Sequence, residues 1–147
     1  MIVSDKVKPV LKWAGGKRQL LGEILECIPQ YTGTYFEPFI GGGAVLFEHM
    51  PKKAVINDFN PELIMLYKVI KETPEQLVEK LKEHATYYSE KGKDYYYEIR
   101  NLDRDCDYYS KMSEVEKASR TVFLNRTCFN GLYRVNKSGK FNVPFGK

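Results

Sequence analysis

The sequence predicts an α/β fold with a parallel sheet, because two short strands are each followed by a helix. An aromatic-rich run at 35–39 leads into three glycines, and an apolar segment that can begin a helix follows from 44. A second apolar run, 54–56, ends at Asn57-Asp58, and Asn60-Pro61 then supplies an N-cap and a proline suited to the first helical position. Such alternation favours a parallel sheet whose ligand crevice lies beyond the carboxyl ends of the strands.

Three further helices are predicted from apolar spacing and capping residues. Leucines and isoleucines recur at helical spacing over 16–28 and stop at Pro29. Thr73 with Gln76, and Ser113 with Glu116, each have the spacing of a capping box at the start of a helix.

The second half of the chain changes character. Seven tyrosines lie between 87 and 109 without strand-like alternation, which predicts irregular or short helical structure there. Residues 132–135 and 140–143 flank a turn-rich connection and predict a β-hairpin. We therefore place a boundary between a first part, 1–72, and a mainly helical second part, 73–147.

Composition limits the classes of protein to consider. The chain has 147 residues, of which 43% are hydrophobic and 29% charged, so a packed core is expected and disorder is not. Residues 117–147 carry seven basic side chains and no acidic one, whereas the whole chain has a net charge of +4. A basic segment without carboxylates, interleaved with aromatic residues, favours a nucleic acid partner over a merely solvated face.

Nothing in the sequence indicates secretion, a membrane or a metal. Three widely spaced cysteines support neither a disulfide framework nor a metal site. No apolar run approaches the roughly 20 residues that span a bilayer, and the polar start has no signal-peptide core. We expect a cytoplasmic protein.

The glycine turn and the strand-tip carboxylate together predict a nucleoside site. Glycines let a ligand approach the backbone, and Asp58 at the tip of the second strand can accept two ribose hydroxyls. A nicotinamide-dependent oxidoreductase is one alternative, although Leu46 stands where its fingerprint requires a third glycine. A noncatalytic DNA-binding module is another, but it leaves the turn and Asp58 without a role.

A second motif lies near the start of the first helix. Gly15-Gly16-Lys17 ends like a phosphate-binding loop, but Arg18 replaces the required Ser or Thr. A lysine at a helix N-terminus instead suits a ligand carboxylate.

Four separated motifs resemble those of the Dam-type DNA adenine methyltransferases. They are KWAGGK at 12–17, FEPFIGGG at 36–43, NDFN at 57–60, and FNGLYR at 129–134 with FNVPFG at 141–146. The resemblance implies a Rossmann-like methyltransferase fold, incomplete in this chain, that binds S-adenosyl-L-methionine beside a DNA target-recognition subdomain. It also implies that the cofactor is held by Trp13, Lys17, Glu37, Gly41 and Asp58, with Lys17 near the methionine carboxylate, Glu37 and Gly41 at the methionyl end, and Asp58 on the ribose.

The same resemblance assigns DNA contacts to the basic segment. Leu132, Arg134 and Pro144 would lie near bases, and Arg126 and Asn130 near the backbone. The other expected contacts are Lys12, which would face a base, Phe129, which would fill the gap left by a flipped nucleotide, the hairpin lysines Lys137 and Lys140, and Lys147, where relatives usually have arginine.

The family's catalytic Asp-Pro-Pro-Tyr box does not occur in these 147 residues. We therefore expect no catalytic residue and no metal in this chain, which reads as the N-terminal portion of a longer, site-specific adenine methyltransferase and would be inactive alone. A sheet with two strands leaves an open edge, so we expect association with the downstream remainder or with a second copy. The resemblance favours duplex DNA with a GATC-like site as the target.

Overall fold

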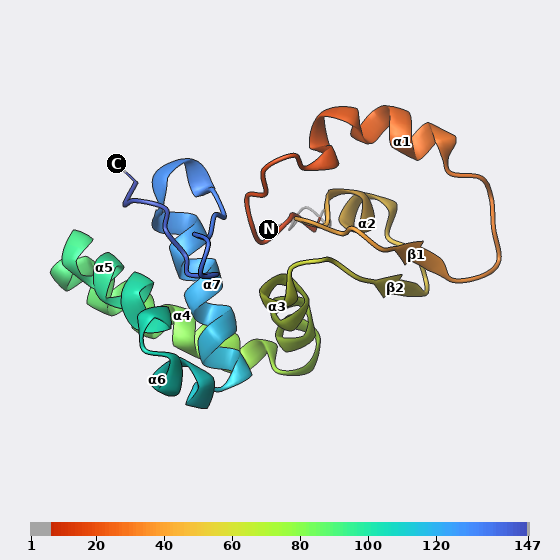
Figure 1. Ribbon diagram of the computed structural model, residues 1–147. Coiled ribbons are helices and arrows are strands. Elements are labelled where there is room, and N and C mark those ends of the chain that lie inside the picture. Colours follow the sequence, from red (N-terminus) through yellow and green to blue (C-terminus); the bar gives the residue numbers. More distant parts are fainter. Residues whose placement is uncertain (1–6, 147) are drawn as a thin grey trace, which may run out of the picture. The chain divides into compact units, whose positions relative to one another are not determined.

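A computed structural model describes residues 7–146, and these divide into two compact units, one within Met1–Phe59 and one within Asn60–Lys147. Figure 1 labels their helices and strands. The division falls 13 residues before the expected boundary at 72/73, because the helix that begins at Pro61 packs mainly within the second unit. The functional roles of the two parts remain predictions.

The N-terminal unit contains the two predicted strands and three helical segments. Its elements are the 3-10 turn η1 (Lys17–Leu20), α1 (Leu21–Cys27), β1 (Tyr35–Glu37), α2 (Ala44–His49) and β2 (Ala54–Ile56). The strands pair in parallel, with Phe36 opposite Val55, so the predicted parallel arrangement is confirmed for this pair. The fold is thus mixed and mainly helical with a small parallel sheet, and a larger Rossmann-like sheet stays a prediction.

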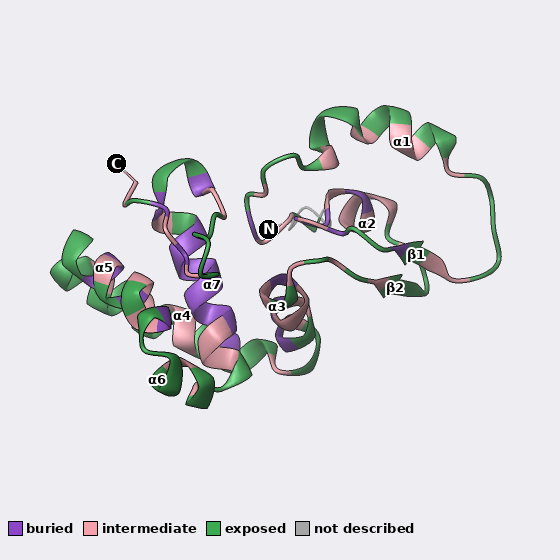
Figure 2. Ribbon diagram, viewed as in Figure 1, coloured by how far each residue is buried: buried purple, intermediate pink, exposed green. Residues whose placement is uncertain are grey.

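The C-terminal unit is helical throughout its first two thirds. It comprises α3 (Pro61–Glu72), α4 (Pro74–Lys91), α5 (Lys93–Asn101), η2 (Leu102–Arg104), α6 (Cys106–Lys111), α7 (Glu114–Thr127) and η3 (Phe129–Gly131). Helix α7 packs against α3, α4 and α5 and is buried on nearly all sides from Ala118 to Asn125 (Figure 2). Its core joins α5 to the last segment of the chain through Tyr96, Phe123, Phe141 and Val143.

The two predicted capping boxes have opposite outcomes. Ser113 accepts from the Glu116 amide, and the Glu116 carboxylate accepts from the Ser113 amide, so the box at α7 is confirmed. The box predicted at Thr73 was wrong, because this residue also ends α3 and its hydroxyl donates to the Val69 carbonyl instead.

Of two other expectations, one is met in part and one needs correction. The tyrosine-rich stretch contains the short helices α5 and α6, as predicted, but its first part belongs to the long helix α4, which continues to Lys91. Tyr95 and Tyr96 of α5 are buried in the core. The predicted β-hairpin contains no extended strand. It is a loop closed by the isolated antiparallel bridges Val135↔Phe141 and Cys128↔Phe145, held largely by side chains from other elements.

Within residues 7–146, none of the helices combines the length and apolar character needed to cross a membrane.

Candidate cofactor and DNA sites

A partly buried ion pair links the first helical turn to the end of β1. Lys17 Nζ lies 3.2 Å from Glu37 Oε1 and donates to the Phe39 carbonyl at 2.5 Å. Glu37 is only 5% exposed, and a buried carboxylate needs such compensation. One lysine therefore lies beside one carboxylate at the carboxyl end of the strand.

Tyr35 completes the polar surroundings of Glu37. Its hydroxyl donates to Glu37 Oε2 at 3.2 Å. Burial, and then the neighbouring Glu37 charge, raise the pKa of Tyr35 to about 12, so the phenol keeps its proton at neutral pH. The Glu37 carboxylate is thus oriented by groups on both of its oxygens.

The glycine turn after β1 is joined directly to the tip of β2. The Gly41 amide donates to Asp58 Oδ2 at 2.9 Å, and the Ile40 amide donates to the Asn57 carbonyl at 2.9 Å. Gly41 has φ +54°, and a Cβ there would lie 3.1 Å from Trp13 Cδ1. This position therefore requires glycine both for its backbone conformation and for the indole packed against it.

The five residues expected at the cofactor, here called the cluster, come from three separated segments of the N-terminal unit and make two sets of contacts. Trp13 packs on Gly41, and the Gly41 amide donates to Asp58. Lys17 pairs with Glu37. The cluster offers a cation, a carboxylate, an aromatic face and a second carboxylate at a turn without side chains. Such a set complements a ligand that carries an amino-acid zwitterion and a ribose.

An apolar hollow of this unit lies away from these five residues. A cavity of about 630 Å³ between α1 and β1 is lined by side chains that include Leu20, Ile24, Ile28 and Phe36. It contains none of the five clustered residues, and its lining has few polar groups to orient a ligand. The five residues, unlike this hollow, include charged groups that can orient a polar ligand.

The predicted DNA residues of the C-terminal unit lie on or beside one loop. The Phe129 amide donates to the Pro144 carbonyl at 2.9 Å, which closes residues 129–144 into a loop, here called the recognition loop. The predicted DNA residues on this loop are all exposed or half-exposed: Phe129, Asn130, Leu132, Arg134, Lys137, Lys140 and Pro144. Arg126 is exposed on the last turn of α7. Lys12 is exposed in the N-terminal unit, and Lys147 lies outside the described residues.

Within the recognition loop, Arg134 is oriented by Asn142. Arg134 Nε donates to Asn142 Oδ1 at 2.8 Å, and Nη2 donates to the Asn142 carbonyl at 3.1 Å. Sequence reasoning gave Asn142 no role of its own. The available signal was its place in the predicted hairpin, opposite Arg134.

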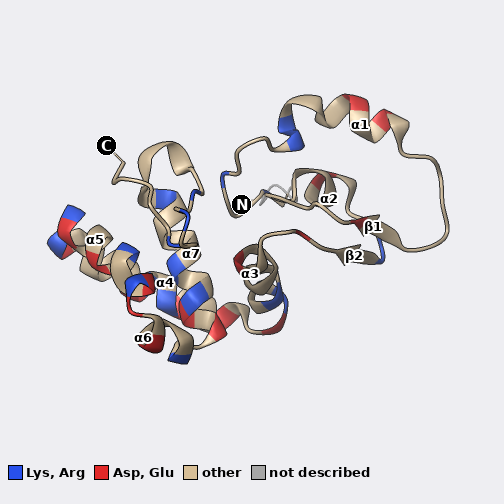
Figure 3. Cartoon of the chain, viewed as in Figure 1, with Lys and Arg blue, Asp and Glu red and all other residues tan. Residues whose placement is uncertain are grey.

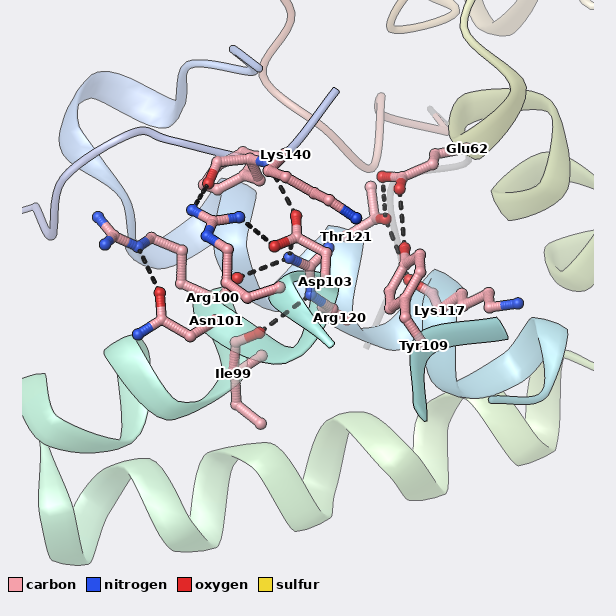
Figure 4. Close-up of polar contacts among 12 residues, drawn as sticks. Glu62, Ile99, Arg100, Asn101, Asp103, Tyr109, Lys117, Arg120, Thr121 and Lys140 are labelled. Atoms are coloured by element: carbon pink, nitrogen blue, oxygen red, sulfur yellow. Dashed lines mark hydrogen bonds and ion pairs between the residues drawn. The ribbon is translucent and has the colours of Figure 1, made fainter. Parts of the chain in front are cut away.

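Glu62, which sequence reasoning also missed, ties the loop to α3. It accepts hydrogen bonds from the Tyr133 hydroxyl at 2.9 Å and the Tyr109 hydroxyl at 2.8 Å, and Figure 4 shows Tyr109 and Thr121 directed at it. Burial, and then the Glu62 charge, raise the pKa of both tyrosines above the ordinary value. Both phenols are therefore donors at neutral pH.

Figure 3 shows acidic and basic residues interspersed along α4, α5 and α6, in contrast with the carboxylate-free sequence from 117 onward. Within residues 7–146, no three or more His, Cys, Asp or Glu side chains are grouped so as to hold a metal ion.

A comparison with protein families decides the identity of the chain. The model of the D12 class N6 adenine-specific DNA methyltransferases matches residues 13–147. The chain belongs to this family. The match includes the five residues of the cluster, from Trp13 onward, and the whole recognition loop, in agreement with the Dam-type resemblance.

Named methyltransferases are similar to almost the whole chain. Type II methyltransferase M1.LlaDCHI of Lactococcus lactis subsp. cremoris is 52% identical over 141 residues, covering 96% of this chain and 48% of the relative. Type II methyltransferase M.MjaIII of Methanocaldococcus jannaschii is 44% identical, covering 97% and 53%. The DNA adenine methylase of Haemophilus influenzae is 36% identical, covering 96% and 48%. The chain therefore spans about half the length of these relatives.

Proposed function

We propose that this D12-class chain supplies the S-adenosylmethionine-binding and DNA-recognition parts of a site-specific adenine methyltransferase. The observation that carries the proposal is the convergence of Trp13, Lys17, Glu37, Gly41 and Asp58 in one unit. When bound, S-adenosylmethionine supplies the methyl group that is transferred to the N6 amine of an adenine. A Rossmann-like sheet around the cluster is part of the proposal.

The charges of the cluster suit the two ends of this cofactor. Lys17 would hold the methionine carboxylate and Glu37 its ammonium group, since a lysine beside a carboxylate presents both signs at the site of a zwitterion. Asp58, held by the Gly41 amide, would accept from the ribose hydroxyls. Trp13 would border the cofactor with its indole.

The recognition loop would bind duplex DNA, with a GATC-like site as the proposed target. Its lysines and arginines lie on a segment without carboxylates, which favours contact with phosphates. Phe129 is 49% exposed and offers a ring that could fill the gap left by a flipped adenine. Transfer itself needs acceptors for the adenine amine, and the Asp-Pro-Pro-Tyr box that serves this purpose in the family is not among these residues.

The N-terminal unit also supports a proposal about a protein partner. Phe36 and Val55 are paired across the sheet and are 67% and 52% exposed, so one apolar face is uncovered. We propose that it associates with the polypeptide corresponding to the unmatched half of the relatives, or with a second copy of this chain.

Calorimetric titration with S-adenosylmethionine tests the cofactor proposal. We expect saturable binding by the chain, and a loss of about tenfold or more in Asp58→Ala, because each hydrogen bond to a charged group contributes about 1.5–3 kcal/mol. Asp107→Ala, an exposed carboxylate on α6, is the matched control and should bind normally. If the chain, both alone and with its unmatched half supplied, takes up no cofactor, a noncatalytic DNA-binding module becomes the better description.

A further inference from the structure

The recognition loop has little regular structure to hold its shape. It contains one isolated bridge, Val135↔Phe141, and a second, Cys128↔Phe145, joins the residues on either side of it, but it forms no β-ladder. A side chain that reads a base must nevertheless be held to within a fraction of an ångström. The loop therefore depends on groups outside itself for its position.

One such group is a pair of neighbouring side chains on η2. Asp103 Oδ2 accepts from the Phe141 amide at 2.8 Å, and Arg104 Nη2 donates to the Phe141 carbonyl at 2.5 Å. Both main-chain polar groups of Phe141 are thus bound by adjacent residues, as a neighbouring strand would bind them. Arg104 also pairs with Asp103 directly.

A buried arginine on α7 fixes this pair. Arg120 is only 1% exposed, and its Nη2 lies 2.9 Å from Asp103 Oδ2 (Figure 4). It also donates to the carbonyls of Ile99 at 3.0 Å and Arg100 at 2.8 Å. A buried guanidinium is stable only with such partners, so the Asp103 carboxylate has little freedom to leave.

The anchored residue lies next to the one that orients Arg134. Phe141 is followed by Asn142, whose side chain and carbonyl accept from Arg134 and whose amide donates to the Arg134 carbonyl at 3.0 Å. A continuous set of contacts therefore runs from Arg120 through Asp103 and Phe141 to Arg134. A shift of the Phe141 backbone would be transmitted to the Arg134 guanidinium.

We propose that Asp103 and Arg104, held by Arg120, are positioning residues that fix the recognition loop so that Arg134 can discriminate between base pairs. This inference rests on the proposed function of the loop as a DNA reader. The three charged side chains on η2 and α7 would thus affect sequence specificity through the position of the loop, without contacting DNA themselves.

Selection from a pool of random DNA duplexes tests the proposal without assuming a site. The chain is incubated with the pool, bound duplexes are sequenced, and the affinity ratio between the enriched sequence and its single-substitution variants is measured at several salt concentrations. Arg104→Met is the main variant, because Arg104 is partly exposed and its loss leaves the buried Asp103–Arg120 pair intact. Leu77→Ala, on α4, is the control for reduced stability alone.

We expect Arg104→Met to lower the affinity ratio about tenfold, the size of one bidentate base contact, while the salt dependence stays unchanged. Hydrogen exchange at the Phe141 amide should accelerate in the same variant. Asp103→Asn should have the stronger effect, and Leu77→Ala should keep the ratio of the unaltered chain.

Two results would overturn the inference. An unchanged affinity ratio in Arg104→Met would show that the loop does not need this anchor. A uniform loss for all sequences, with a lower salt slope, would make Arg104 a direct phosphate contact instead. If the unaltered chain enriches no sequence, the proposed reading function fails, and this inference fails with it.

Discussion

At the scale of single residues, Asn142 fixes the orientation of the Arg134 guanidinium. Asn142 accepts hydrogen bonds from Nε and Nη2 of the guanidinium. The end of the guanidinium formed by Nη1 and Nη2 therefore faces away from Asn142. That end can donate two parallel hydrogen bonds to a guanine edge. Lys137, by contrast, is a point charge on the exposed turn of the loop.

Substitution of Arg134 and of Lys137 should therefore have different effects on DNA binding. Arg134→Ala is expected to relax recognition at one base pair, at a cost of about 1–3 kcal/mol for the preferred sequence. Lys137→Ala should weaken all duplexes alike and reduce the slope of affinity against salt by about one ion. Fluorescence anisotropy with the preferred and a scrambled duplex separates these outcomes, and equal effects of both variants would remove Arg134 as a reader.

At the scale of elements, one histidine joins three helices of the C-terminal unit. His84 on α4 is hydrogen-bonded to the Tyr95 hydroxyl of α5 at 2.8 Å and to Ser119 Oγ of α7 at 3.2 Å. Its ring stacks on Phe123 with centroids 5.0 Å apart. Burial lowers the pKa of His84, against a smaller opposing effect of Glu83, so the packed helices favour the neutral ring.

This unit should lose stability in mildly acidic solution. Because the pKa of His84 is lower in the folded state, the unfolded chain binds more protons once the pH falls below about 6.5. The stabilisation is complete above that pH and declines as the pH falls through the folded pKa. Urea denaturation at several pH values should show this decline in the unaltered chain and a smaller one in His84→Gln, and parallel profiles would contradict it.

At the scale of the whole molecule, the two units differ in how far they bury their apolar side chains. The C-terminal unit encloses a core around Tyr96, Leu124 and Val143. The N-terminal unit exposes Phe36 on its sheet, and Phe59 at its end is 95% exposed. Exposed apolar surface of this kind marks an interaction site or promotes association.

We expect the chain alone to self-associate through the uncovered sheet face. Phe36→Lys should shift the sedimentation profile toward monomer, because a charge on that face opposes apolar contact. Tyr108→Lys, at an exposed aromatic residue on α6, is the matched control and should leave the profile unchanged. A monodisperse monomer for the unaltered chain at micromolar concentration would contradict the expectation.

Local signals were sufficient where neighbouring residues supply all the contacts. The strand 54–56, the start of α3 at Asn60-Pro61 and the Ser113 capping box follow from adjacent residues, and each is confirmed. The capping box predicted at Thr73 has the same local signal but does not form, because the Thr73 hydroxyl donates to the Val69 carbonyl of the preceding helix. The tyrosine-rich helices and the loop in place of a hairpin depend on packing partners far along the chain.

The glycine turn, Asp58 and the carboxylate-free basic segment are local patterns, so the sequence was enough to indicate the family and to propose the residues of both candidate sites. How these side chains are held could be read from the folded chain alone: Lys17 pairs with Glu37, Arg134 donates to Asn142, and Asp103 accepts from the Phe141 backbone. Such contacts join residues 8 to 38 positions apart. Their geometry follows from which elements pack together, and that is set by the burial of the core rather than by neighbours in sequence.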